Sequence, residues 1–357
     1  MPWKERYTIS DEKSILDADI KWPGGKRCCF RVAVDLSPAC GPDGIKPENL
    51  TTPDAYYGMN GGLDALAGVL DRFGIKATFA VPAVIAEIQA DKLKRIAGNG
   101  HEIAAHGFKH EDVSTLSKEE EHARLDRTTS ILTKVVGQRP AGWFSLARPG
   151  DKFAGGAVSP HTIDLLLDGG YEYFGNGLAD DAPHYWVSDF ASRRAILALP
   201  YYYHFDDQFF LLFPRKGTGL ENPDSLYRNW KAELDAQYKR GRHFSIVVHP
   251  HAIAWPNRLH MLEQFLDYAR GLPELWYATS AECARHWTRT FPAATHLKLQ
   301  PSIWQDYPGS LGRWTTFSRP RAAWPRWSAR RETTASSTDI SSLAFWRQCT
   351  TLGCSAR

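Results

Sequence analysis

Short apolar segments rich in valine and alanine alternate with amphipathic stretches along most of this chain. The segments with strand character are residues 28–36, 76–82, 101–106 and 243–251, and those with apolar residues at helical spacing are 63–73, 83–100, 117–137 and 257–271. Strands that alternate with helices at this pitch form parallel β/α units. We therefore predict an α/β protein whose units are able to close into a barrel.

The alternating pattern divides the chain into three parts. Residues 1–27 are polar and irregular and are expected to form an N-terminal arm, whereas residues 28–312 carry the strand and helix pattern of one domain. Residues 313–357 contain eight arginines, no lysine and two acids, with no helical or strand period. We expect this tail to be disordered and without a role in catalysis. A basic tail for an acidic partner and a shifted reading frame both explain the abrupt change in composition.

Composition and charge argue against several classes of protein. The net charge is only +3, and the tail supplies the positive excess, so the remaining chain lacks the basic face of a nucleic-acid binder. No apolar run approaches the roughly 20 residues of a membrane span, and the charged amino end has no signal-peptide core. The six cysteines form no CxxC pair and indicate reduced thiols. These features predict a cytoplasmic protein with no nucleic-acid or membrane partner.

Polar residues of the types used in catalysis and metal binding lie at the ends of the predicted strands. Asp35 ends the first strand, His106 and His110 follow the third, Arg148 follows "GWFSLA", and His249 ends "FSIVVH". The carboxyl ends of parallel strands in β/α folds form one face, where functional sites are built. We therefore expect these side chains to converge, although they are far apart in the sequence.

The stretch "HGFKH" places two of these histidines four residues apart. Imidazole nitrogen is a good ligand for zinc and related metals, and a turn can aim both rings at one ion. A solvated loop in which one histidine bonds to a backbone carbonyl would have the same sequence. Because a strand precedes the stretch and Gly107 can turn the chain, we favour a metal site at His106 and His110.

Four motifs of the sequence resemble those of a known family. "VAVDLS", "GHEIAAHGFKH", "PAGWFSLARP" and "VVHP" occur in the order found in polysaccharide deacetylases (NodB-homology proteins). The resemblance covers residues 28–290 and is strongest to the cytoplasmic branch of peptidoglycan-deacetylase-like and allantoinase-like amidohydrolases. It implies an irregular (β/α) barrel and an enzyme that hydrolyses a carbon–nitrogen amide bond.

The resemblance also implies roles for individual residues. His106 and His110 match the family's metal-binding histidines, for which zinc is the expected divalent ion. Asp35 matches an aspartate that acts as base or metal ligand, His249 matches the general acid, and Arg148 lies near an arginine that orients the base. Such groups suit amide hydrolysis, which needs an activated water and an acid for the leaving nitrogen.

The first motif departs from the family pattern at Ser37, where a second aspartate is expected. Either Asp35 alone completes the site, or the metal is weak or absent. If Asp35 is a ligand, one carboxylate oxygen can bind the ion while the other accepts a proton. Asp181, in "DDAPHYW", matches loosely the position of a substrate-facing acid.

The resemblance gives expectations for substrate and assembly as well. A cytoplasmic enzyme has poor access to an acetylated polymer, so we expect a small amide or N-acetylated substrate. Relatives in this branch form homo-oligomers, and we expect the same here. The alternative function is a catalytically inactive barrel that binds a carbohydrate or serves as a structural protein, because the missing second aspartate is compatible with lost activity.

Overall fold

The computed structural model describes residues 15–148, 151, 156–177, 180–189, 192–212 and 222–297. The expectations for the tail at 313–357 therefore lie outside the described residues. Within the described residues, no helix is both long and apolar enough to cross a membrane.

Nine strands of the described residues form one sheet. They are β1 (Cys28–Asp35), β2 (Thr78–Val81), β3 (Glu102–Ala105), β4 (Gly142–Trp143), β5 (Tyr173–Gly177), β6 (His184–Asp189), β7 (Arg194–Pro200), β8 (His243–Val248) and β9 (Leu275–Tyr277). Their order is β6-β7-β5-β4-β3-β2-β1-β8, and β9 also pairs with β1. Every pairing is parallel except that of β6 with β7, which is antiparallel. The parallel β/α architecture predicted from the sequence is confirmed.

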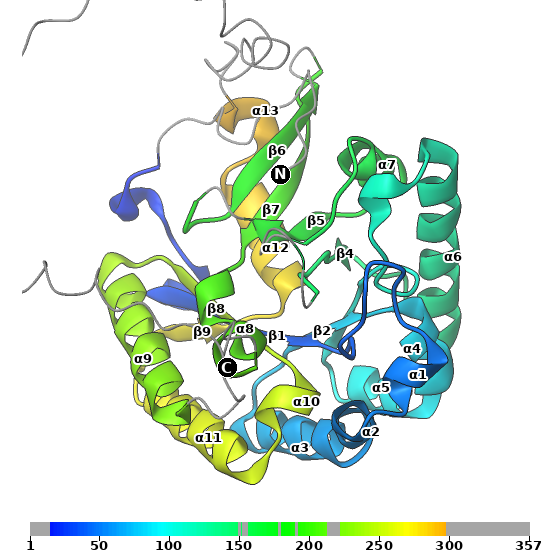
Figure 1. Ribbon diagram of the computed structural model, residues 1–357. Coiled ribbons are helices and arrows are strands. Elements are labelled where there is room, and N and C mark those ends of the chain that lie inside the picture. The colour runs from blue at the N-terminus through cyan, green and yellow to red at the C-terminus, as the bar shows by residue number, and fades with distance from the viewer. Residues whose placement is uncertain are drawn as a thin grey trace, which may run out of the picture. The chain divides into compact units, whose positions relative to one another are not determined.

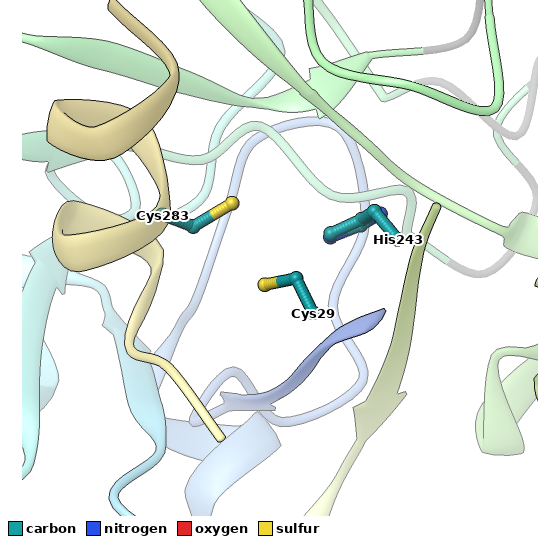
Figure 2. Close-up of side chains that lie close together, drawn as sticks. All are labelled: Cys29, His243 and Cys283. Carbon is teal, nitrogen blue, oxygen red and sulfur yellow. The ribbon is translucent and has the colours of Figure 1, made fainter. Parts of the chain in front are cut away.

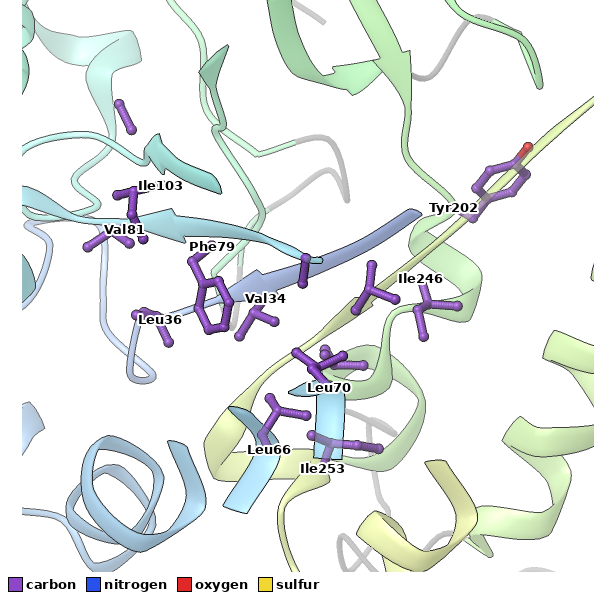
Figure 3. Packing of buried hydrophobic residues seen from close by; sticks show 14 of the residues in the cluster. Val34, Leu36, Leu66, Leu70, Phe79, Val81, Ile103, Tyr202, Ile246 and Ile253 are labelled. Carbon is purple, nitrogen blue, oxygen red and sulfur yellow. The ribbon is translucent and has the colours of Figure 1, made fainter. Parts of the chain in front are cut away.

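Both faces of the sheet are buried. Along β1, Val32 and Val34 pack into a large cluster with the surrounding helices, whereas Cys29 and Ala33 belong to a second cluster on the opposite face. Figure 3 shows the first cluster, in which Val34 of β1 lies close to Leu70. Burial on both sides explains why the strand is apolar throughout, as strands of parallel sheets are.

Helices pack along the outside of the strands, as Figure 1 shows for α3, α6, α9 and α11. The longer helices are α3 (Leu63–Phe73), α5 (Ala90–Gly98), α6 (Lys118–Val136), α9 (Pro223–Arg240), α11 (Pro256–Arg270) and α12 (Ser280–Thr290). The shorter helices are α1 (Pro47–Leu50), α2 (Pro53–Tyr57), α4 (Ala83–Ile88), α7 (Thr162–Asp168), α8 (Asp207–Leu211), α10 (Pro250–Ile253) and α13 (Ala293–His296).

Local sequence signals set several helix ends. Ser117 and Glu120, spaced as in a capping box, begin α6: the Ser117 hydroxyl accepts the Glu120 N–H, and the Glu120 carboxylate accepts the Ser117 N–H. Helix α3 ends as predicted at Gly74, whose φ of 67° is the left-handed conformation that glycine adopts readily.

Three boundaries differ from the prediction. The single helix expected over 83–100 is two helices, α4 and α5, because Gln89 between them has non-helical φ and ψ of −110° and 29°. The strand expected over 243–251 ends at Val248, and Pro250 begins helix α10. The segment between β1 and α3 has no strand or helix period in its sequence and would be taken for a loop, yet it contains α1, α2 and a π-helical turn at Gly58–Gly62.

Candidate active site

Asp35 is the centre of the candidate site and ends strand β1. Its side chain is fully buried, and its Oδ1 accepts hydrogen bonds from the Ser37 backbone N–H at 2.7 Å and the Ser37 hydroxyl at 2.6 Å. The other oxygen, Oδ2, lies 3.4 Å from His106 Nε2 and 3.2 Å from His249 Nε2. Burial raises the pKa of Asp35, but the two imidazoles outweigh it and hold the pKa well below its usual value.

His106 follows strand β3 and presents one nitrogen to Asp35. Its Nδ1 lies 3.0 Å from the backbone carbonyl of Phe144 and must donate the proton in that bond. Its Nε2 therefore keeps a lone pair in the neutral ring. Neither His106 Nε2 nor Asp35 Oδ2 has a hydrogen-bond partner among the described residues, although both atoms are buried.

His110 is near His106 but is held differently. The ring centroids are 4.1 Å apart, yet His110 Nε2 bonds to the Leu146 carbonyl at 2.8 Å, and its Nδ1 lies 3.9 Å from Cys40 Sγ. The backbone of His110 has a φ of 58°, which is unusual for a residue other than glycine. Burial, together with the neighbouring His106, lowers the pKa of His110 to about 3.

His249 directly follows strand β8 and is oriented by a carboxylate. Its Nδ1 lies 2.7 Å from Asp207 Oδ1, and its backbone N–H donates to Asp207 Oδ2 at 2.9 Å. The opposite nitrogen, Nε2, therefore points towards Asp35. Burial lowers the pKa of His249, but Asp206, Asp207 and Asp35 outweigh it and raise the pKa well above its ordinary value. These contacts favour a ring with a proton on both nitrogens.

Sequence reasoning missed Asp206 and Asp207, which belong to this site. They follow strand β7, so the rule that led to Asp35 and His249 would also have indicated them. Asp206 caps helix α8 by accepting the Gln208 N–H at 2.9 Å, and its second oxygen accepts the Tyr201 hydroxyl at 2.7 Å. Burial is the main reason that the pKa of Asp206 rises to about 7.

Arg148 lies after strand β4 and holds the loop beside the histidines. Its guanidinium donates to Asp151 Oδ1 at 2.8 Å and to the His110 backbone carbonyl at 3.2 Å, and it is almost fully buried. A cavity of about 20 Å³ lies against Arg148, His106 and His110. That volume is enough for about one water molecule.

Asp181 is not brought to the site. It forms ion pairs with Arg240 and Arg242, and its backbone carbonyl shares the Tyr202 hydroxyl with the carbonyl of His243. His243 begins strand β8, whereas the site lies at the carboxyl end of that strand. Asp181 therefore lies near the opposite end of the sheet from Asp35.

The donor atoms fit the metal ion implied by the resemblance only in part. Asp35 Oδ2 and His106 Nε2 are a carboxylate oxygen and an imidazole nitrogen, both buried and unpartnered, which suits a divalent ion such as zinc. His110 has turned one nitrogen to a carbonyl and the other towards Cys40, so it does not complete the set in this conformation. Among the described residues, two other groups bring three ligand atoms together: Asp206, Asp207 and His249; and Cys29, His243 and Cys283.

The fold and the site together define a class of protein: a parallel β/α domain that gathers carboxylates and imidazoles at the carboxyl ends of its strands. Residues 46–171 match the family model of polysaccharide deacetylases. This match spans about a third of the chain and agrees with the resemblance of its motifs to that family.

Individual proteins are similar to this chain in sequence or in structure. The chain is 22% identical over 257 residues to the peptidoglycan deacetylase of Helicobacter pylori, covering 65% of this chain and 85% of that protein. It is similar in structure to a Mycobacterium smegmatis protein described as a polysaccharide deacetylase, with a TM-score of 0.65, 27% identity and coverage of 80% and 98% of the two chains. An allantoinase also has this fold, with a TM-score of 0.65, 22% identity and coverage of 78% and 95%.

Proposed function

We propose that this chain is a hydrolase of carbon–nitrogen amide bonds, with Asp35, His106 and His249 at its centre. The observation that carries the proposal is the convergence of Asp35 Oδ2 with the Nε2 atoms of two histidines, at 3.4 and 3.2 Å, in a buried position. A buried charged cluster of this kind is costly for folding, and such clusters are concentrated at functional sites. The match of residues 46–171 to the polysaccharide deacetylase model supports the same reaction class.

Asp35 and His106 would hold a divalent ion, for which we propose zinc. When bound, the ion would polarise the amide carbonyl and lower the pKa of water. Ser37 directs two donors at Asp35 Oδ1, so only Oδ2 is free to act. A role in which Asp35 binds the ion through one oxygen and takes a proton on the other is therefore not supported by the geometry. Oδ2 is either ligand or base.

His249 acts as the general acid in this proposal. Asp207 accepts the Nδ1 proton, which aims the Nε2–H of the protonated ring at the region of Asp35. Transfer of that proton to the amide nitrogen turns it into an amine leaving group, and the carbon–nitrogen bond breaks as the carbonyl re-forms. The carboxylate of Asp207 keeps the ring in the correct orientation throughout. Arg148 positions the backbone of His110 rather than the substrate.

The first experiment combines metal analysis with a substrate screen. The purified protein is assayed with and without chelator on N-acetylglucosamine oligomers, by acetate release, and on cyclic ureides, by ring opening. Because all site atoms are deeply buried, we expect turnover of a small amide and its loss on chelation. His106→Ala is expected to lose metal and turnover, whereas the matched control His122→Ala, at an exposed position on α6, should keep both.

Asp35→Asn separates the two roles of Asp35. Loss of both metal and turnover would assign the ligand role, and retained metal with lost turnover would assign the base role. Turnover at the level of the unaltered protein would contradict the proposal. The second candidate is an inactive barrel that binds carbohydrate, and the observation that favours it is Ser37 in place of a second acid. Saturable sugar binding without hydrolysis of either substrate class would support that candidate instead.

A further inference from the structure

Two cysteines and a histidine converge inside the domain, away from the candidate active site. Cys29 lies on β1, His243 on β8 and Cys283 on α12, and all three are fully buried. Figure 2 shows their side chains directed towards a common space. Both sulfurs and one ring nitrogen of His243 lie within 4.8 Å of one another. Six residues of β1, or about 20 Å of extended strand, separate Cys29 from Asp35.

The sheet itself sets this arrangement. Cys29 and His243 are register partners on the parallel strands β1 and β8, so their side chains leave the sheet on the same face. Cys283 reaches that face from α12, in the same apolar cluster as Cys29. The three groups are therefore placed by rigid elements rather than by loops.

Arg31 limits what His243 can do. The Arg31 Nε–H donates to His243 Nε2 at 2.7 Å, and because arginine can only donate, Nε2 must be the acceptor. The proton of the neutral ring is then on Nδ1, which is buried and has no hydrogen-bond partner among the described residues. In this state His243 offers the cluster a hydrogen-bond donor and not a lone pair.

Arg31 also brings a positive charge close to the two sulfurs. It is buried, and its other hydrogen bonds go to the Ser280 hydroxyl at 2.6 Å and the Pro200 carbonyl at 3.2 Å, so all three of its hydrogen-bond partners are neutral. The carboxylate of Glu102 acts on Arg31 through space without a direct hydrogen bond. The charge of Arg31 acts on both Cys29 and Cys283. An anionic group built on the two sulfurs would be stabilised by this guanidinium.

We propose that Cys29 and Cys283 form a buried site for one monovalent thiophilic cation, copper(I). Thiolate ligands select copper(I), and two thiolates with one such ion carry one net negative charge, which the nearby Arg31 stabilises. With a metal–sulfur bond of about 2.3 Å, two sulfurs on opposite sides of one ion are about 4.6 Å apart. The sulfurs of Cys29 and Cys283 lie within 4.8 Å of each other, which is compatible with that separation. Zinc prefers four ligands, and the lone pair of His243 is already taken by Arg31.

Two thiols release two protons to solvent and one copper(I) ion binds both sulfurs, with no change in oxidation state. The ion would link β1 to α12 within the apolar cluster that contains both cysteines. Burial protects the thiolates from oxidation and fits an ion acquired during folding.

The test uses the full chain with Cys349 and Cys354 replaced by serine, so that the remaining four cysteines are the buried ones. The protein is titrated anaerobically with copper(I) against the chelator bathocuproine disulfonate, and separately with zinc(II) against a chromogenic indicator. We expect one copper(I) per chain and ultraviolet absorption from sulfur-to-copper charge transfer. Copper(I) should also raise the melting temperature of this parent protein, a measurement that needs no further variant.

Variants identify the ligands. Cys29→Ser and Cys283→Ser should each weaken copper(I) binding by at least about 100-fold, since losing a ligand costs more than losing an outer-shell partner. Cys28→Ser is the matched control, because Cys28 is the buried neighbour of Cys29 but lies in the other cluster, and it should bind as the parent does. If Cys29→Ser does not fold, Cys283→Ser and the melting temperature of the parent still decide the result.

Three results would overturn the proposal. The first is equal copper(I) affinity of the parent and Cys29→Ser, with bathocuproine disulfonate removing the ion from both. Another is one zinc(II) per chain that is lost in His243→Gln, which would make His243 a ligand. The third is a Cys29–Cys283 disulfide in the purified protein, seen as a mass lower by two hydrogens, which would make the pair a redox couple.

Discussion

Replacing Asp207 with asparagine tests the orientation of His249 directly. Asp207 uses one oxygen for the His249 ring Nδ1–H and the other for the His249 backbone N–H. An asparagine offers one carbonyl oxygen and an NH₂ group, so one of the two donors must lose its acceptor. A hydrogen bond to a charged group contributes about 1.5–3 kcal/mol. At about 1.4 kcal/mol per tenfold, we expect a rate lower by about 10- to 150-fold.

The adjacent Asp206 provides a matched control. Asparagine caps helices as well as aspartate does, so Asp206→Asn keeps the bond from the Gln208 N–H, and the Tyr201 hydroxyl can turn to donate or accept. We expect this variant to lose less rate than Asp207→Asn, because it removes one charge near His249 but leaves the acceptor of the His249 Nδ1–H in place. The assay is the hydrolysis rate on the substrate found in the screen, with histidine ¹⁵N NMR to report protonation of His249 Nδ1.

The outcome depends on the difference between the two aspartates. A rate for Asp207→Asn within threefold of the unaltered protein, together with an unchanged His249 signal, would refute the role of Asp207. Equal losses in the two variants would also refute it, because the effect would then come from the general loss of negative charge. A shift of the NMR signal in Asp207→Asn alone would support it even if product release limits the rate.

Other predictions concern stability and assembly. Burial, together with the charge of His249, lowers the pKa of His251 to about 3. Unfolding therefore takes up a proton below about pH 6.5, and the free energy of unfolding falls as the pH falls. His251→Gln should reduce the slope of that dependence by up to about 1.4 kcal/mol per pH unit, measured by denaturant titration. Gly142→Ala would place a methyl group 1.8 Å from the ring of Tyr173 and should destabilise by about 1–3 kcal/mol, whereas Gly98→Ala meets nothing within 4 Å and should not destabilise. Truncation after Leu311 should leave activity intact, and a large loss would contradict the expectation for the tail. Light scattering should show a homo-oligomer, and a monomer at micromolar concentration would count against it.

Most of the site residues predicted from the sequence follow from one rule: functional side chains gather at the carboxyl ends of parallel strands. Asp35, His106 and His249 come together because β3, β2, β1 and β8 are consecutive neighbours in the sheet and all run in the same direction. Their convergence follows from strand order and needs no knowledge of side-chain rotamers. The same rule applied to β7 would have indicated the consecutive acids Asp206 and Asp207.

The sequence could not predict features that depend on local side-chain partners. His110 turns away because two carbonyls after β4, those of Phe144 and Leu146, each take one histidine nitrogen, and the segment that carries them has no regular pattern. Asp181 pairs with Arg240 of α9 and Arg242 of the following turn, beside the start of β8, and the sequence pattern gives no sign of these side-chain partners. The spacing of Cys29 and Cys283, 254 residues apart, gives no sign that they meet.

Ser37 changes the meaning of the departure from the family pattern. From the sequence, the missing second acid suggested a weakened site. In the structure, Ser37 donates twice to Asp35 Oδ1, and this fixes the carboxylate so that Oδ2 alone faces His106 and His249. A second carboxylate at that position would have repelled Asp35 instead of donating to it. Serine at this position therefore leaves one well-oriented carboxylate oxygen, Asp35 Oδ2, in place of two acids that repel each other. That single oxygen is either the metal ligand or the base.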